Sequence, residues 1–219
     1  VDRVVGGSVV GDDILVGSSA NDEIVVSTVV TGNNNSGGMA GQAKTVFTLA
    51  GVQFEGFEQV SGGDGDDVFG INLDEDAPFA GTIFGGGGDD QFVMMPGGTV
   101  AILDGGSGRD VLDYSSFSDP VSANFSQNNA TQVGGVVNLE EVIGGTAVDT
   151  LTGNEGNNQF RITGLNTGML NGNLFSDFEL LRGLAGQDSF LFENQGSVDS
   201  FDGNSGADTF LLDDRNLTE

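Results

Sequence analysis

Large apolar residues recur along this chain in short runs, separated by clusters of Gly and Asp. Within these runs apolar and polar side chains tend to alternate, as in Gln159–Ile162, which is the period of a half-buried β-strand. No stretch of ten or more residues has the 3.6-residue apolar period of an amphipathic helix. The pattern predicts an all-β protein with little or no helix.

One eight-residue frame recurs nine times: a small residue, two free positions, Gly or Ala, a free position, Asp or Asn, a free position and a large apolar residue. The clearest copies are GGDGDDVF from Gly62, GGGGDDQF from Gly85 and GGSGRDVL from Gly105. The sixth positions are Asp13, Asp22, Asp67, Asp90, Asp110, Asp149, Asn158, Asp188 and Asp208. The eighth positions are Leu15, Ile24, Phe69, Phe92, Leu112, Leu151, Phe160, Phe190 and Phe210.

The frames recur at spacings that suit stacked coils. Many successive frames begin about 20 or about 40 residues apart, and two pairs begin 9 residues apart. Glycine permits positive φ angles and close backbone approach between stacked turns. Because one such coil cannot bury its own apolar face, its stability must come from its neighbours. We therefore predict an elongated β-solenoid, similar to a β-roll or β-helix, with coils of about 20 residues and ladders of Phe inside.

A larger repeat overlies the coils. Residues 57–69 recur at 178–190, a shift of 121, whereas residues 11–24 recur at 147–160, a shift of 136. We predict that residues 1–27 end one large unit, 28–45 form a Gly/Asn/Ser-rich loop, 46–153 form one unit and 154–219 begin the next. Neither end resembles the polar cap of a repeat array, so we expect the chain to be part of a longer array.

Composition and charge exclude several classes of function. The chain has 38 Gly, no His and no Cys, and its 33 acidic residues against 6 basic ones give a formal charge of -27. Without His or Cys it has no Ser-His-Asp triad, no thiolate zinc site and no disulfide. Its charge repels phosphate, which excludes nucleic acid as a partner, and its apolar runs are too short to span a membrane. The abundant carboxylates favour hard cations.

The frame resembles the nonapeptide G-G-x-G-x-D-x-U-x of hemolysin-type calcium-binding (RTX) repeats. The resemblance implies that the Asp side chain and carbonyls of the glycine turn bind Ca²⁺ between stacked turns, while the U residue fills the core. It thus implies the nine sixth-position residues as calcium ligands. The alternative is that these Asp and Asn side chains only accept hydrogen bonds from N–H groups of tight turns. The segments F-E-x-V-x-G-G, L-D-G-G and V-L-D-Y-S also resemble long β-strand-repeat proteins of bacterial surfaces.

This sequence departs from the family pattern in its spacing. Only the frames of Ser8 and Gly17, and those of Gly144 and Gly153, have the 9-residue spacing of a β-roll. The other turns are expected along one edge, with Asp67, Asp90 and Asp110 as the best candidate ladder. Asn158 lacks a charge and is the weakest ligand, and Arg109 makes the neighbouring Asp110 site doubtful.

Three glutamates share a second recurring signature, in which an apolar residue precedes Glu shortly before a glycine frame. They are Glu58, Glu140 and Glu179. Because an active site occurs once and a scaffold feature occurs in every unit, we expect these residues to face solvent on strands, and we predict no catalytic residue. A glycosidase-type acid pair stays open among the 33 carboxylates. The sequons at Asn34, Asn124, Asn129 and Asn216 leave glycosylation open as well.

Together these features predict a structural repeat module without enzymatic activity, located outside the cell or on a bacterial surface. It would belong to a fibre, stalk or giant adhesin, with Ca²⁺ at the Gly-Asp turns folding and stiffening it. Its partners would be neighbouring copies, as an end-to-end filament or a tandem array, and possible further partners include cell-surface polysaccharide. The alternatives are a carbohydrate- or surface-binding adhesin module and the calcium-binding secretion tail of a secreted hydrolase.

Overall fold

The computed structural model describes residues 3–5, 13–31, 42–193 and 195–213. The chain divides into two compact units: unit 1 is Val1–Asp110 with Gln132–Asn138, and unit 2 is Val111–Thr131 with Leu139–Glu219. All regular elements in the described residues are β-strands, which confirms the all-β prediction. No helix long and apolar enough to cross a membrane occurs among them.

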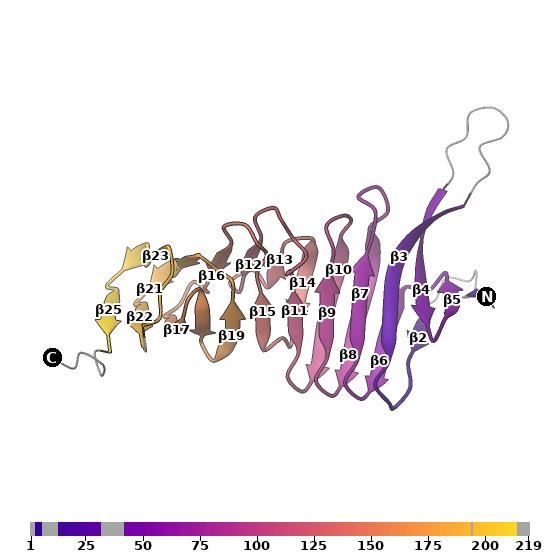
Figure 1. The fold of residues 1–219 in the computed structure, drawn as a ribbon, viewed down its shortest axis with the longest axis horizontal. Coiled ribbons are helices and arrows are strands. Elements are labelled where there is room, and N and C mark those ends of the chain that lie inside the picture. Colours follow the sequence, from indigo (N-terminus) through magenta and orange to yellow (C-terminus); the bar gives the residue numbers. More distant parts are fainter. Residues whose placement is uncertain (1–2, 6–12, 32–41, 194, 214–219) are drawn as a thin grey trace. The chain divides into compact units, whose positions relative to one another are not determined.

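Unit 1 contains strands from two sheets. Its strands are β1 (Arg3–Val5), β2 (Ile14–Val16), β3 (Glu23–Thr31), β4 (Gln42–Leu49), β5 (Val52–Glu55), β6 (Gln59–Asp64), β7 (Val68–Asn72), β8 (Phe79–Gly87), β9 (Gln91–Met94), β10 (Val100–Ser107) and β14 (Val133–Val137). Their order is β1-β5-β4-β3-β7-β9 in one sheet and β2-β6-β8-β10-β14 in the other. Figure 1 shows β6, β8 and β10 side by side.

Parallel neighbours in unit 1 advance in step with the frames. Val60 of β6 pairs with Ile83 of β8, which pairs in turn with Leu103 of β10. In the other sheet Phe69 of β7 pairs with Phe92 of β9, so that equivalent positions of successive frames lie side by side. Successive strands β6 to β10 alternate between the two sheets, which places the glycine turns between them.

Unit 2 is built on similar lines. Its strands are β11 (Val111–Asp113), β12 (Ser122–Asn124), β13 (Asn129–Ala130), β15 (Glu141–Ile143), β16 (Thr150–Thr152), β17 (Gln159–Gly164), β18 (Thr167–Leu170), β19 (Asn173–Ser176), β20 (Leu180–Arg182), β21 (Ala185–Gly186), β22 (Ser189–Phe192), β23 (Ser200–Asp202), β24 (Ser205–Gly206) and β25 (Thr209–Leu212). The order is β11-β15-β19-β18-β17-β22-β25 in one sheet, β13-β12-β16-β20-β23 in a second, and β21-β24 as a short pair.

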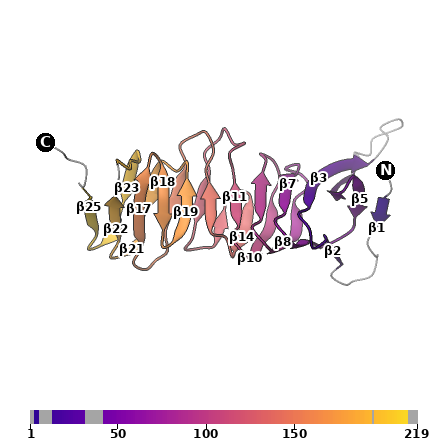
Figure 2. The ribbon, with the colours of Figure 1, turned by 60° about the horizontal axis from the view of Figure 1, so that its bottom comes forward.

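Each unit also contains an antiparallel three-stranded segment that the sequence did not predict. In unit 1 it is β3-β4-β5, and in unit 2 it is β17-β18-β19, whose strands lie side by side in Figure 2. Strands β3 and β4 extend into both ends of the predicted loop 28–45, where β-branched residues favour extended backbone. Residues 32–41 lie outside the described residues.

The eighth positions of the frames form much of the core. Eight of the nine are buried, and parallel pairing places Phe rings over one another. The rings of Phe69 and Phe92 stack at 5.0 Å in unit 1, and those of Phe160 and Phe190 at 4.7 Å in unit 2. Phe210 is the exception, with 50% of its surface exposed, although its ring stacks on Phe201 at 5.3 Å.

Candidate metal centre

The glycine turns of unit 1 stack backbone against backbone. The second residue of three frames is a glycine with a positive φ, with values of 108° at Gly63, 116° at Gly86 and 100° at Gly106. A Cβ on Gly86 would collide with the carbonyl oxygen of Gly63, and one on Gly106 with that of Gly86. Only glycine provides both this conformation and this closeness.

A ladder of hydrogen bonds joins the sixth positions of unit 1. The backbone N–H of Asp22 donates to Oδ1 of Asp67 (2.6 Å), that of Asp67 to Asp90 (2.8 Å) and that of Asp90 to Asp110 (2.8 Å). We call this series, and its counterpart in unit 2, the sixth-position ladder. It contains the predicted Asp67, Asp90 and Asp110, and it adds Asp22 across a separation of 45 residues.

The counterpart in unit 2 has three members. The backbone N–H of Asn158 donates to Oδ1 of Asp188 (2.8 Å), and the N–H of Asp188 donates to Oδ1 of Asp208 (3.0 Å). Asn158 and Asp188 are buried, whereas Asp208 is exposed. The structure thus groups seven of the nine predicted ligands into two ladders.

The other two predicted ligands, Asp13 and Asp149, belong to different stacks that involve the recurring glutamates. The N–H of Asp13 donates to Oε2 of Glu58 (3.0 Å), and the N–H of Asp149 donates to Oε2 of Glu179 (2.8 Å). Asp149 in turn accepts the N–H of Val121 through Oδ1 (2.7 Å). Glu58 and Glu179 therefore accept backbone hydrogen bonds from neighbouring turns. The prediction that the recurring glutamates lie on strands was wrong, because each of these two lies just before a strand. Of the two, Glu58 is exposed and Glu179 half-buried.

A second ladder runs through the fifth positions, which sequence analysis treated as free. The N–H of Asp66 donates to Oδ1 of Asn21 (3.1 Å), that of Asp89 to Asp66 (2.9 Å) and that of Arg109 to Asp89 (2.9 Å). In unit 2 the N–H of Gln187 donates to Oδ1 of Asn157 (2.8 Å). This fifth-position ladder runs opposite to the sixth-position ladder. Its signal in the sequence was Asn or Asp at each accepting position.

Burial makes the charged form of the ladder carboxylates costly. Asp67 and Asp90 are each only 1% exposed. The pKa of Asp90 is raised to about 6, mainly by burial and also by the charges of Asp110 and Asp67, while the hydrogen bond from the Asp67 N–H lowers it. Burial also raises the pKa of Asp67. A nearby cation would offset these costs.

The second carboxylate oxygens offer a place for a hard cation. Oδ2 of Asp67, Asp90 and Asp188 is buried and has no hydrogen-bond partner among the described residues. A Cβ on Gly62 would meet both Oδ2 of Asp67 and, at 2.7 Å, the carbonyl oxygen of Gly85 in the next turn. Acceptors without a donor suit a metal ion better than they suit each other.

Carboxylate side chains alone do not provide a metal site at these turns. No group of three or more Asp or Glu side chains suited to a metal occurs in the described part of the chain. A site at these turns would therefore combine the carboxylate of Asp67 or Asp90 with glycine carbonyl oxygens. Ca²⁺ accepts such a mixed set of six to eight oxygens in irregular geometry. The residues present fit this ion.

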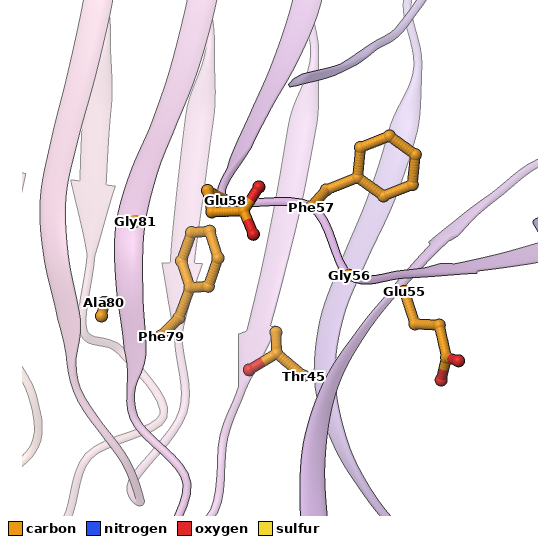
Figure 3. Close-up of a pocket in the computed structure, with 8 residues that line it drawn as sticks. All are labelled: Thr45, Glu55, Gly56, Phe57, Glu58, Phe79, Ala80 and Gly81. Atoms are coloured by element: carbon orange, nitrogen blue, oxygen red, sulfur yellow. The ribbon is translucent and has the colours of Figure 1, made fainter. Parts of the chain in front are cut away.

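A pocket in unit 1 brings carboxylates and aromatic rings together (Figure 3). Its lining is Thr45, Glu55, Gly56, Phe57, Glu58, Phe79, Ala80 and Gly81. Phe79 is buried, with its ring edge-on to Phe47 at 5.3 Å, and Glu58 accepts the N–H of Asp13. The carboxylates of Glu55 and Glu58 do not point toward one another in Figure 3. These groups serve the fold and do not form a facing acid pair.

Comparison with protein families identifies part of the frame. The model of the RTX calcium-binding nonapeptide repeat matches in four copies, over residues 9–25, 82–93 and 140–161. These segments contain the sixth positions Asp13, Asp22, Asp90, Asp149 and Asn158. Comparison with curated proteins found no match. The glycine-aspartate turns in the three matched segments are thus those of the RTX calcium-binding nonapeptide repeat, a family whose ion is Ca²⁺.

Proposed function

We propose that this chain is a structural repeat module of an extracellular bacterial fibre, stalk or giant adhesin, folded and stiffened by Ca²⁺ at its Gly-Asp turns. The observation that carries the proposal is the sixth-position ladder of unit 1. There, buried carboxylates are joined turn to turn by hydrogen bonds of 2.6 to 2.8 Å. Such a repeated arrangement is expected of a scaffold, whereas catalysis needs one special site.

The same observations support a β-solenoid whose coils match the spacing of the frames. The parallel pairs of Val60 with Ile83 and of Ile83 with Leu103 advance in step with the ladder of hydrogen-bonded aspartates. The turns also stack directly on one another, because a Cβ added at Gly86 or Gly106 would collide with the backbone of the preceding turn. In an array of this kind each coil is stabilised mainly by its neighbours. We therefore propose further copies of the repeat as partners, arranged in tandem or end to end.

Calcium would act on the charge of the stacked turns. Asp67 and Asp90, with glycine carbonyls, would hold the ion, and bound Ca²⁺ would supply the positive charge that these turns lack. The millimolar Ca²⁺ of extracellular fluids suits sites of modest affinity. Because the unfolded chain has no assembled site, binding would favour the folded state by about 2.7 kcal/mol per site at 100 times Kd.

The experiment that tests the proposal compares the chain in excess chelator with the chain in Ca²⁺. We expect far-UV circular dichroism to show strand signal that grows on Ca²⁺ addition, with Mg²⁺ at equal concentration as the control ion. The variant Asp67→Asn/Asp90→Asn keeps the Oδ1 acceptors and removes two charges, so it should bind fewer Ca²⁺ ions. An identical strand signal and melting temperature with and without Ca²⁺ would reject the metal-dependent function.

Electron microscopy of the calcium-loaded protein tests the structural role. Filaments or end-to-end chains support the fibre or stalk. Separate particles that bind a polysaccharide would favour an adhesin module instead. Separate particles without such binding, in a chain naturally joined to a hydrolase domain, would favour a secretion tail.

A further inference from the structure

Asn158 is the one asparagine among the nine sixth positions. It lies at the end of the turn that precedes β17 in unit 2, and it is fully buried, with 0% of its surface exposed. Its backbone N–H joins the sixth-position ladder by donating to Asp188, as the aspartates of unit 1 do. Asn158 thus takes part in the ladder through its backbone, and its side chain makes other contacts.

The side-chain amide of Asn158 lies in a cluster of oxygen atoms. Its Nδ2 is within 2.8 to 2.9 Å of four of them. They are the carbonyl oxygens of Asn154, Gly156 and Gly183 and Oδ1 of Asp188. An amide NH₂ has two hydrogens, so it can donate fully to only two of these acceptors. Three carbonyls and a carboxylate around one point form the surroundings of a cation.

The orientation of the amide is fixed from its other side. Oδ1 of Asn158 accepts the N–H of Asn154 (2.9 Å) and Nδ2 of Asn171 (2.9 Å). Asn171 is itself held, since its Oδ1 accepts the N–H of Gln159 (2.8 Å). The NH₂ group must therefore face the four oxygens.

The corresponding aspartates in unit 1 lack such a donor. In the part of the chain that the structure describes, Oδ2 of Asp67 and of Asp90 is buried without a hydrogen-bond partner. The carbonyl oxygen of the next turn lies against the same space: Gly85 for Asp67 and Gly105 for Asp90. Where these two turns of unit 1 place an acceptor against acceptors, the Asn158 turn of unit 2 places a donor.

We propose that the amide of Asn158 takes the place of a Ca²⁺ ion at its turn. The turn of residues 153–158 and its contact with residues 183–188 then form without metal and bind none there. This inference rests on the proposed function, because it assumes that the aspartate turns hold Ca²⁺. The inference divides the frames into turns that need Ca²⁺ and one turn in which the Asn158 amide replaces the ion.

Two reciprocal substitutions test this. Asn158→Asp replaces the donor by a second carboxylate beside Asp188, and we expect it to add one Ca²⁺ per chain in equilibrium dialysis. Asp90→Asn places an amide in a unit 1 turn, and we expect it to remove at least one. The second readout is amide hydrogen exchange in chelator. Residues 153–158 should stay protected in the wild type and lose at least tenfold protection in Asn158→Asp, with recovery in Ca²⁺.

The outcomes separate the inference from the proposed function. An unchanged Ca²⁺ count in Asn158→Asp, with unchanged protection in chelator, overturns the inference and leaves the function intact. A wild type that binds no Ca²⁺ while Asn158→Asp binds one overturns the function, and it supports only the part of the inference that concerns the Asn158 turn itself. Where Asn158→Asp does not fold, the wild type alone decides. Exchange at 153–158 as fast in chelator as at 62–67 overturns the inference, and slower exchange supports it.

Discussion

In unit 1 the sixth-position ladder runs through four aspartates, whereas in unit 2 it begins at an asparagine and continues through two aspartates. The backbone geometry is the same in both, with N–H to Oδ1 distances of 2.6 to 2.8 Å in one and 2.8 to 3.0 Å in the other. In the fifth-position ladder the neutral side-chain oxygens of Asn21 and Asn157 accept the equivalent backbone hydrogen bonds, so a bond of this kind does not require a carboxylate. The proposed Ca²⁺ sites would give the buried carboxylates of the sixth-position ladder a role beyond accepting these bonds.

The units also differ in how much chain separates two stacked turns. The ladder partners Asp22 and Asp67 lie 45 positions apart in unit 1, and Asn158 and Asp188 lie 30 positions apart in unit 2. The extra length lies in the antiparallel segments, since β3 and β4 are longer than β17 and β18. Both segments return the chain to a parallel register, in which β3 pairs with β7 and β17 with β22. A coil can thus be extended within its sheet without disturbing the turn that follows.

The largest effect is expected from the Phe ladders. Phe190 is 1% exposed and stacks on Phe160, so Phe190→Ala should lower the free energy of unfolding by about 3–5 kcal/mol. Half the surface of Phe210 is exposed, so Phe210→Ala should lower the free energy of unfolding by only about 1 kcal/mol. Phe92→Ala in unit 1 should match Phe190→Ala. Urea unfolding in Ca²⁺ measures all three, and equal losses for Phe190 and Phe210 would contradict this account of the core.

Next comes the contrast between two fourth-position glycines. Gly88 has a φ of 124°, and a Cβ there would collide with the backbone of Gly65, so Gly88→Ala should cost about 3 kcal/mol. Gly156 lies outside the left-handed region, and a Cβ there would meet only the Asn154 side chain at 3.2 Å. We expect Gly156→Ala to cost less than about 1 kcal/mol. Urea midpoints give the comparison, and similar losses would show that the stacked turns of unit 1 are not tightly packed.

The sequence predicted the parts of this structure that depend on one short frame. Spacing and residue type placed Phe69, Phe92 and Phe190 in the core and the aspartates in ladders, because both follow from position within a turn. The antiparallel segments were missed because strands such as β4 and β18 pair through register, which composition does not specify. The same holds for Glu58, whose partner Asp13 is 45 residues away.

The role of Asn158 was even less accessible from sequence. In the sequence analysis it ranked as the weakest ligand because it lacks a charge, and that ranking considered only the residue itself. The oxygens around its amide come from residues 154, 156, 183 and 188, and its orientation depends on Asn171. Only the stacking of two turns and the turn between β18 and β19 bring these groups together. A donor in place of a metal is recognised from such surroundings.

A pH dependence of smaller size is expected from the sixth-position ladder of unit 1 in metal-free protein. The pKa of Asp90 rises from 3.8 to about 6 on folding, so folding favours its protonated form. Its stabilising contribution is present below about pH 4 and is lost as pH rises through about 6. In chelator, urea midpoints should fall between about pH 5 and pH 7, and less so in Asp90→Asn. Identical pH profiles for the two proteins would contradict the raised pKa of Asp90.

The smallest effects concern the fifth-position ladder. Asn157→Ala removes the acceptor for the N–H of Gln187, and Asp66→Ala removes the acceptor for that of Asp89, so each should cost about 1 kcal/mol. Gln187→Ala keeps its backbone N–H and should change stability by less than about 0.5 kcal/mol. Asp66→Asn keeps the acceptor and should retain the bond, which separates hydrogen bonding from charge.

Urea unfolding in Ca²⁺ measures the four variants. If Gln187→Ala costs as much as Asn157→Ala, side chains at this position matter for packing and not as acceptors, and the two units no longer share this ladder.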